Sequence, residues 1–293
     1  MTHRRRHSGG IAREPTIALA LGGGAARGLA HIAMLEAIEE LGLKPVAIAG
    51  TSMGAIIGAA YAAGLSAKDI REHCEAMLSS RRSFMTTLMR KVPGNLATLW
   101  SPRQPSVVDG VTLLELLMPE PVRADFNSLA VPLSVIATDF YAIGEVILSH
   151  GPVIPAVAAS AALPTILRPV VIDGRVLIDG GFVNPTPYDV VLDKADITVA
   201  VDVTGTPQRR PGLEVPSTME AWVGATQILF HSITREKLKS VAPHVLVRPD
   251  VGNFGTMDFL EINDILAASG AAKDELKRKL DAAITARGRL DHA

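Results

Sequence analysis

The first part of the sequence alternates short apolar runs with longer stretches of helical periodicity. The apolar run at 17–21 predicts a buried strand, and the apolar residues of 25–42 recur at helical spacing up to a closing glycine. A second short apolar run at 46–49 precedes small apolar residues at 53–63 that favour a helix. This β-α-β-α order predicts a parallel sheet with right-handed crossover connections.

Strand character returns in the second half of the chain. Three stretches carry it: 131–140, 144–149 and 196–203. The segment 170–179 predicts a hairpin, because Asp173-Gly174 separates two apolar runs as a tight turn requires. These strands extend the predicted sheet.

Helical periodicity dominates the last part of the chain. Ser217 and Glu220 have the spacing of a capping box, which predicts a helix that runs towards Ser240. Residues 258–290 also have a helical pattern, interrupted near Gly270. Because the sequence has no internal repeat and no clear linker, we expect one α/β domain.

We expect this domain to cover residues 15–293, with a helical part at 205–293. Residues 1–14 contain a cluster of arginines and are expected to form a basic, disordered tail, with a weak anchor for anionic lipid as the alternative. Residues 80–106 mix basic and bulky apolar side chains with three prolines, which predicts an insertion over the fold.

Composition and charge restrict the class of protein. Hydrophobic residues make up 48% and aromatic residues only 4%, so the apolar content is mainly aliphatic, as expected for strands buried between helices. Lys+Arg 29 against Asp+Glu 30 gives a net charge of −1, which argues against nucleic acid as the partner. The single cysteine, Cys74, suggests a reducing compartment, and no apolar run has the length of a membrane span. We therefore expect a cytoplasmic protein.

A candidate nucleophile lies between the second predicted strand and the helix after it. Gly50-Thr51-Ser52-Met53-Gly54 matches G-x-S-x-G in the strand-to-helix context that this motif requires. A turn that directs the serine hydroxyl away from the backbone has room only for small residues two positions on either side. The alternative is a glycine-flanked turn whose serine caps the helix.

A glycine run, Gly22-Gly23-Gly24, follows the first predicted strand and precedes the first helix. Backbone N–H groups at such a positive helix end can hold an oxyanion or a phosphate. A dinucleotide-binding loop fits poorly because its third glycine would fall on Arg27, and a phosphate loop fails because Leu29 replaces its lysine. The run therefore favours an oxyanion hole.

A serine nucleophile also needs a base within about 2.6–3.2 Å. None of the eight histidines has a strand-end, glycine-rich setting; His31, in the first helix, is either a catalytic base or a packed helix residue. Among the carboxylates, Asp179 ends a strand and leads into an irregular glycine-rich segment. Asp173 is explained by its hairpin, and Asp202 is the third candidate.

Three motifs in this order resemble those of the patatin-like phospholipase family, in particular its compact bacterial members: GGGAARG at 22–28, GTSMG at 50–54 and DGG at 179–181. The resemblance runs from about Thr16 to Val203. It implies a single patatin-like α/β domain whose mostly parallel central sheet lies between helices. The α/β-hydrolase fold, the main rival for G-x-S-x-G, places several strands before its serine and ends its catalytic order in a histidine.

The resemblance also implies roles for individual residues. It implies a dyad without histidine, with Ser52 as nucleophile and Asp179 as general base. It implies an oxyanion hole formed by the amides around Gly23, Gly24 and Ala25, although Ala25 stands where many relatives have a further glycine.

Two further residues are substrate-binding candidates, Arg27 and Met53. Arg27 matches the basic position of the family's loop, where it would contact a phosphate or order the loop; the alternative is an arginine exposed on the first helical turn. The resemblance implies neither a metal nor a cofactor.

The activity implied is that of a serine acyl hydrolase, which cleaves ester bonds of phospholipids or lysophospholipids through an acyl-enzyme. A lipid acyltransferase with the same dyad and a non-catalytic module that binds acyl lipids remain alternatives. The expected partner is a lipid ester, with transient contact to a membrane surface; residues 80–106 are either a lid that touches it or a locally packed insertion. The sequence leaves a homo-oligomer open.

Overall fold

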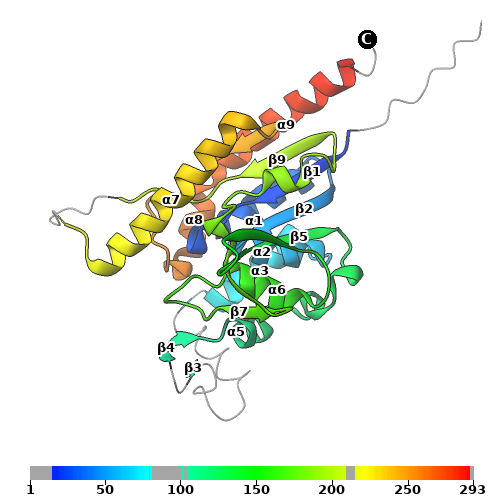
Figure 1. The fold of residues 1–293 in the computed structure, drawn as a ribbon. Helices are drawn as coiled ribbons and strands as arrows, with labels where there is room; N and C mark the ends of the chain where they lie inside the picture. Colours follow the sequence, from blue (N-terminus) through cyan, green and yellow to red (C-terminus); the bar gives the residue numbers. More distant parts are fainter. Residues whose placement is uncertain (1–14, 79, 81–99, 102–103, 209–214, 291–293) are drawn as a thin grey trace, which may run out of the picture.

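The computed structural model describes residues 15–78, 80, 100–101, 104–208 and 215–290 (Figure 1). The predicted basic tail at 1–14 and most of the candidate lid at 80–106 lie outside these residues. In the described part of the chain, β3 (Trp100–Ser101) and β4 (Gln104–Val108) form a separate antiparallel pair.

The described residues form an eight-stranded central sheet. Seven strands follow one another across it in this order: β10 (Val245–Val247), β9 (Ile197–Val201), β1 (Ile17–Leu21), β2 (Pro45–Thr51), β5 (Leu133–Asp139), β8 (Arg175–Asp179) and β7 (Val170–Ile172). The eighth, β6 (Gly144–Leu148), pairs with β5. The four pairings from β10 to β5 are parallel, and the pairings of β6, β7 and β8 are antiparallel. The predicted mostly parallel sheet is confirmed.

The register of β5 brings two strand ends together. β6 pairs with β5 along 135–139, and both β2 and β8 overlap that stretch, so β2 and β8 must share the opposite edge of β5. Thr51 at the end of β2 lies opposite Ile136, and Asp179 at the end of β8 lies opposite Ala137. Because β2 and β8 run towards each other, their carboxyl ends meet head to head.

Helices cover the sheet (Figure 1). The α-helices are α1 (Ala30–Glu40), α2 (Met53–Ala62), α3 (Ala67–Leu78), α5 (Gly110–Leu117), α6 (Val153–Ser160), α7 (Thr218–Ser240), α8 (Ile262–Ala268) and α9 (Gly270–Leu290). Short 3-10 turns are η1 (Ala25–Leu29), η3 (Glu120–Arg123), η4 (Phe126–Ser128), η5 (Gly180–Phe182), η6 (Tyr188–Val191) and η7 (Phe259–Glu261). The first predicted helix thus begins as the 3-10 turn η1.

The two faces of the sheet are packed differently. One carries the large aliphatic core, to which β1 contributes Leu19 and Leu21. On the other face, alternate residues of β1 and β2 are alanines, and the buried Tyr188 of η6 packs against them. Small side chains at period two let the segment that follows Asp179 lie close to the sheet. This packing fixes the position of the segment that follows Asp179, the predicted base.

Several local predictions are confirmed. Asp173 and Gly174 both have positive φ angles, 50° and 75°, in the turn between β7 and β8. Ser217 and Glu220 form the capping box of α7, and the C-terminal helix is interrupted between α8 and α9. Of the helices in the described residues, none is long and apolar enough to cross a bilayer.

Candidate active site

Ser52 occupies the sharp turn between β2 and α2. Its backbone angles, φ 53° and ψ −120°, lie where side-chain-bearing residues are rarely found. A Cβ at Gly50 would lie 2.6 Å from the Cα of Ala55, and one at Gly54 would clash with the carbonyl of Leu21. The glycines on either side of Ser52 are therefore required by close backbone packing, as the motif predicts.

Two hydrogen bonds hold this turn. The amide of Ser52 donates to the Oγ of Ser160 over 2.8 Å, and the hydroxyl of Thr51 donates to the carbonyl of Asn184 over 2.7 Å. Ser160 is fully buried at the end of α6. Our sequence analysis missed it, although it is the one polar side chain in the helix VIPAVAAS.

Asp179 lies at the end of β8 with its side chain buried. Its Oδ1 accepts a hydrogen bond from the Gly181 amide at 2.8 Å, and the hydroxyl of Ser52 is near enough to lower the pKa of the same carboxyl group. Burial raises the pKa of Asp179 to about 6, against the lowering effect of these two groups. Such a carboxylate is still largely ionised at neutral pH yet more basic than an exposed one, which suits a general base.

The glycine loop contributes three residues to the pocket lining, Gly23, Gly24 and Ala25. The Gly23 amide donates to the carbonyl of Pro185 at 2.9 Å, so its proton is already engaged. Gly24 and Ala25 follow in the pocket wall, and among the described residues neither amide has a hydrogen-bond acceptor. The predicted set of three donors narrows to these two. Ala25 has a φ of 48°, a conformation that favours glycine.

His31 lies beneath the loop and outside the pocket wall. Its Nε2 is 2.8 Å from the carbonyl of Gly22, and burial lowers its pKa to about 4, so the ring is neutral at pH 7 and donates this hydrogen bond. Asp202 is paired with Arg248 at 3.0 Å and accepts hydrogen bonds from Thr204. Both alternative bases therefore have structural partners away from Ser52.

Arg27 is buried, so the alternative of an arginine exposed on the first helical turn is wrong. Its Nη1 donates to the carbonyl of Phe254 at 3.0 Å and its Nε to that of Val203 at 3.4 Å. The side-chain amide of Gln227 makes hydrogen bonds to Arg27 when its oxygen faces that residue. In this orientation the oxygen lies 2.8 Å from Nη2 and 2.9 Å from Nη1 of Arg27. Burial lowers the pKa of Arg27 to about 10, so the group remains charged at pH 7. It lines the pocket, and its hydrogen bonds join the glycine loop to the segments that carry Val203 and Phe254.

Met53 does not lie where we expected it. The residues that line the pocket include Ser52 but not Met53. The Met53 side chain packs against Gly28, where a Cβ would clash with its Cβ and Cγ atoms. The structure therefore gives no support to the prediction that Met53 contacts the substrate.

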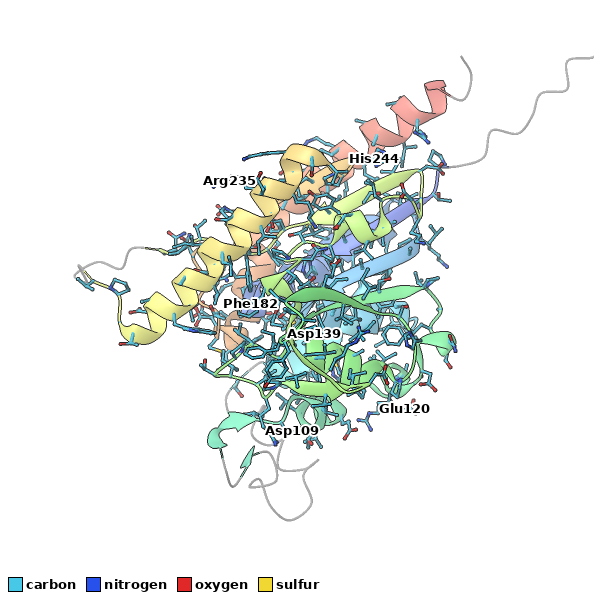
Figure 2. All side chains as sticks on the ribbon, viewed as in Figure 1. Asp109, Glu120, Asp139, Phe182, Arg235 and His244 are labelled. Atoms are coloured by element: carbon cyan, nitrogen blue, oxygen red, sulfur yellow. The ribbon has the colours of Figure 1, made fainter. Side chains whose placement is uncertain are left out.

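Helix α7 forms a wall of the pocket that the sequence did not reveal. Four of its residues face the pocket: Val223, Thr226, Gln227 and Phe230. Their i, i+3, i+4, i+7 spacing marks one helix face, but half of them are polar, so the hydrophobic pattern alone does not identify it. The ring of Phe230 lies on Gly181, where a Cβ would be 2.5 Å from it, and packs edge to face on Phe182, 5.3 Å between centroids. Phe182 is labelled in Figure 2.

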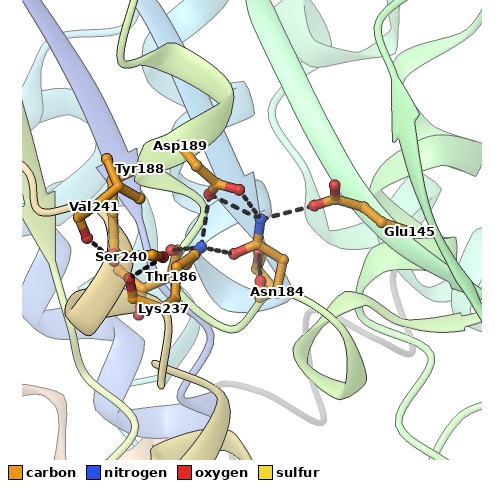
Figure 3. A network of polar contacts seen from close by, with 9 residues as sticks. Glu145, Asn184, Thr186, Tyr188, Asp189, Lys237, Ser240 and Val241 are labelled. Atoms are coloured by element: carbon orange, nitrogen blue, oxygen red, sulfur yellow. Dashed lines mark hydrogen bonds and ion pairs between the residues drawn. The ribbon is translucent and has the colours of Figure 1, made fainter. Parts of the chain in front are cut away.

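A polar network joins the C-terminal end of α7 to the segment after Asp179 (Figure 3). The Nζ of Lys237 donates to Asn184, to the carbonyl of Thr186 at 2.8 Å and to Asp189 at 2.6 Å. Asn184 donates in turn to Glu145 at 2.7 Å. Because the carbonyl of Asn184 also accepts from Thr51, this network supports both strand ends that meet at the site.

Comparison with known proteins adds to this geometry. The model of one family, described as patatin-like phospholipase, matches residues 19–192. An uncharacterised NTE family protein of Mycobacterium tuberculosis is 34% identical over 221 residues, which cover 74% of this chain and 58% of that protein. Patatin-like phospholipase domain-containing protein 6 of Homo sapiens is 32% identical over 191 residues, which cover 64% of this chain and 13% of that protein.

The fold is also similar to a solved structure. The crystal structure of VipD from Legionella pneumophila matches over 91% of this chain and 67% of that chain, with 14% sequence identity and a TM-score of 0.48. The chain spans less than two thirds of the length of the mycobacterial relative that it matches.

Proposed function

The chain belongs to the patatin-like phospholipase family, and from this premise we propose that it is a serine acyl hydrolase that cleaves carboxylic ester bonds of lipids. The observation that carries the proposal is the position of Ser52 and Asp179. They lie on strand ends that meet and line one pocket, and the Ser52 side chain lowers the pKa of Asp179. The amides of Gly24 and Ala25 line the same pocket.

The proposed first half-reaction forms an acyl-enzyme. Asp179 accepts the hydroxyl proton of Ser52 while the Oγ attacks the ester carbonyl. The amides of Gly24 and Ala25 stabilise the negative charge on the carbonyl oxygen, each contributing about 3 kcal/mol to the lowering of the barrier. Asp179 then returns the proton to the departing alcohol oxygen as the C–O bond breaks, which leaves the acyl group on Ser52.

The second half-reaction repeats this chemistry with water. Asp179 accepts a proton from a water molecule while the oxygen of that water attacks the carbonyl carbon of the acyl-enzyme. The same amides hold the second oxyanion. The bond to Ser52 breaks, Asp179 returns the proton to the serine oxygen, and a carboxylic acid is released. One base thus serves both halves, so no histidine is needed.

The pocket wall suggests how a lipid ester would bind. Leu163, Val223 and Phe230 provide apolar surface for an acyl chain. Arg27 and Gln227 provide a charged and polar region beside them. We therefore propose a phospholipid or lysophospholipid as the substrate, with its acyl chain on the apolar side and its polar part towards Arg27.

Fluorophosphonate labelling tests the nucleophile. We expect the wild-type chain to be labelled, Ser52→Ala to be unlabelled, and the exposed control Ser232→Ala to be labelled like the wild type. Incubation with phosphatidylcholine and lysophosphatidylcholine, followed by analysis of released fatty acid, tests the reaction. Labelling of Ser52→Ala, or release of fatty acid by that variant at the wild-type rate, would overturn the assignment.

The same assay separates the alternatives. An acyltransferase would transfer the acyl group to an added alcohol in preference to water, and a non-catalytic lipid-binding module would give neither labelling nor product. A hydrolase releases free fatty acid whether or not an acceptor alcohol is present.

A further inference from the structure

Helix α7 contains an unusually long uncharged stretch. Residues 221–234 include no Asp, Glu, Lys or Arg, whereas Glu220 precedes the stretch and Arg235 follows it. At a rise of about 1.5 Å per residue, this part of the helix is about 20 Å long. A helix on the surface of a protein normally carries charged residues on its solvent side, so this stretch calls for a physical explanation.

The uncharged stretch has a mixed inner side and an outer side with exposed apolar residues. Its inner side faces the pocket through Val223, Phe230 and their polar neighbours. Its outer side exposes Ile228 and Leu229, with 60% and 44% of their surface open to solvent, and the small residues Ala221 and Ala225 are also exposed. One helix therefore separates the candidate active site from a strip of exposed apolar surface.

The attachment of α7 is strongest at its C-terminal end. There Lys237 binds Asn184, Thr186 and Asp189, and its Nζ lies 4.4 Å from the centre of the Tyr188 ring. Closer to the N-terminus of the helix, the ring of Phe230 packs on Gly181. The N-terminal end is closed by its own capping box, whose residue Ser217 is exposed. The uncharged stretch lies between these two ends and packs on the pocket through its inner side.

We propose that the outer side of α7, defined by Ala221, Ala225, Ile228 and Leu229, docks on a lipid surface. The helix would lie in the plane of the interface with its apolar side in the acyl region, as amphipathic interfacial helices do. Arg235, exposed just beyond the uncharged stretch, would face the lipid phosphates. The proposal rests on the proposed acyl-hydrolase function.

The pocket decides between a lipid surface and a protein partner. α7 is itself a pocket wall, so whatever covers its outer side lies beside the candidate active site. A lipid surface in that position supplies substrate over a short path. A second copy of the chain or another protein would instead cover the site. The absence of charge along the stretch also suits hydrocarbon better than a protein interface with a polar rim.

Vesicle flotation of the Ser52→Ala chain tests the proposal without hydrolysis. Vesicles of phosphatidylcholine alone and of phosphatidylcholine with an equal amount of phosphatidylglycerol are the probes. We expect the chain to float with vesicles and the added change Ile228→Glu with Leu229→Glu to lower its partition coefficient by about tenfold or more. The anionic lipid should strengthen binding of the parent chain.

The control is a matched pair near the end of β2 opposite to Ser52. Leu41 and Val46 are 37% and 40% exposed and lie just before and at the start of β2, whereas Ser52 follows its end. Leu41→Glu with Val46→Glu should float like the parent. Equal flotation of the α7 variant, equal loss in both variants, or no flotation of the parent would overturn the proposal.

Two further measurements localise the contact. With Trp100→Phe in place, Trp222 of α7 is the remaining tryptophan, and its emission should shift to shorter wavelength on vesicle binding. Light scattering should give the same molar mass for the parent and the α7 variant; a parent dimer that dissociates in the variant would show that a second copy covers this side.

The failure of the docking proposal is distinct from failure of the proposed function. Fluorophosphonate labelling is done on chains that keep Ser52, and the Ile228→Glu, Leu229→Glu variant should be labelled at the wild-type rate. Loss of labelling in the wild type contradicts the acyl hydrolase, whereas unchanged flotation of the variant contradicts docking by α7.

Discussion

The amide of Ser52 donates a 2.8 Å hydrogen bond to the hydroxyl of Ser160, which comes from a different element and is fully buried. The bond supports a residue whose φ of 53° is unfavourable by itself. A buried amide that loses its acceptor costs about 1–3 kcal/mol. Ser160 is therefore expected to position Ser52, the proposed nucleophile, without contacting substrate.

Ser160→Ala should lower the free energy of unfolding by about 2 kcal/mol and lower kcat with little change in KM. We expect kcat to fall because Ser52 is misplaced, and KM to stay nearly the same because the pocket that binds the substrate is kept. Ser269→Ala is the matched control, since Ser269 is equally buried but only donates to the carbonyl of Ile265. A Ser160 variant with wild-type kcat would show that the turn at Ser52 keeps its conformation without this hydrogen bond.

The carboxylate of Asp179 should make the wild-type protein less stable at neutral pH than a variant with asparagine at this position. Its folded pKa of about 6 exceeds the usual 3.8, so the folded state binds the proton more tightly than the unfolded state. The stabilisation is fully present below pH 3.8 and is lost as the pH rises through 6, a change of about 3 kcal/mol. Asp179→Asn should thus be inactive, yet more stable than the wild type at pH 7, by about 2 kcal/mol.

The contribution of His31 to stability has the opposite pH dependence. Its pKa is lowered to about 4, so its contribution to stability is present above pH 6.5 and is lost as the pH falls through 4. In the wild type the two contributions oppose each other between pH 6 and 4. Urea denaturation at pH 7 and pH 4 should show the stability advantage of Asp179→Asn disappearing at pH 4. An equal advantage at both pH values would contradict the raised pKa.

Lys237 should stabilise both ends of the candidate site through one ammonium group. Lys237→Met keeps the aliphatic stem but removes the donor to Asn184, Thr186 and Asp189. We expect a loss of about 2 kcal/mol, less than for a fully buried pair because Asp189 is 36% exposed. The exposed ion pair of Lys239 with Glu236 provides the control, and Lys239→Met should change the stability by less than about 0.5 kcal/mol.

Much of the fold was accessible from sequence because its signals are local. The short apolar runs and the helical patterns predict β1, β2, β9 and the C-terminal helices, and the Asp173-Gly174 turn specifies the β7–β8 hairpin. Small residues on both sides of Ser52 marked the turn because the backbone itself excludes larger ones.

The rest depends on contacts between distant segments. Head-to-head pairing of β2 and β8 on one edge of β5 is a matter of register, which no pattern within one strand encodes. The hydrogen bond from Gly23 to Pro185 and the burial of Arg27 arise in the same way. The α7 wall was missed because its inner side mixes Thr226 and Gln227 with apolar residues.

Ala25 is expected to carry backbone strain that glycine would relieve. Its φ of 48° places the Cβ close to the backbone, at a cost of about 1 kcal/mol for an alanine. Ala25→Gly should therefore raise the stability by a part of that amount and leave kcat unchanged, because the amide is kept. Ala26→Gly is the control with the opposite sign: Ala26 is buried in the same turn with no positive φ, and thermal melting should show it destabilised.

Phe230 is expected to set the basicity of Asp179 by keeping water away from it. The ring rests on Gly181, whose amide binds the Asp179 carboxylate, and burial is the main cause of the raised pKa. Phe230→Ala opens this side to water, so the pKa of Asp179 should fall towards 3.8. The acid limb of the kcat/KM profile, expected near pH 6 in the wild type, should move to lower pH by about one unit. A weaker base should also lower kcat at pH 7.

A short-chain ester that dissolves in water is the substrate for this measurement, because it separates the chemistry from docking on lipid. Leu229→Ala is the matched control, since Leu229 is the neighbouring residue of α7 and points outward. It should leave the acid limb in place. If Phe230→Ala lowered kcat but kept the limb near pH 6, the ring would act on substrate position alone, and the polar surroundings of Asp179 would have to be the source of its basicity.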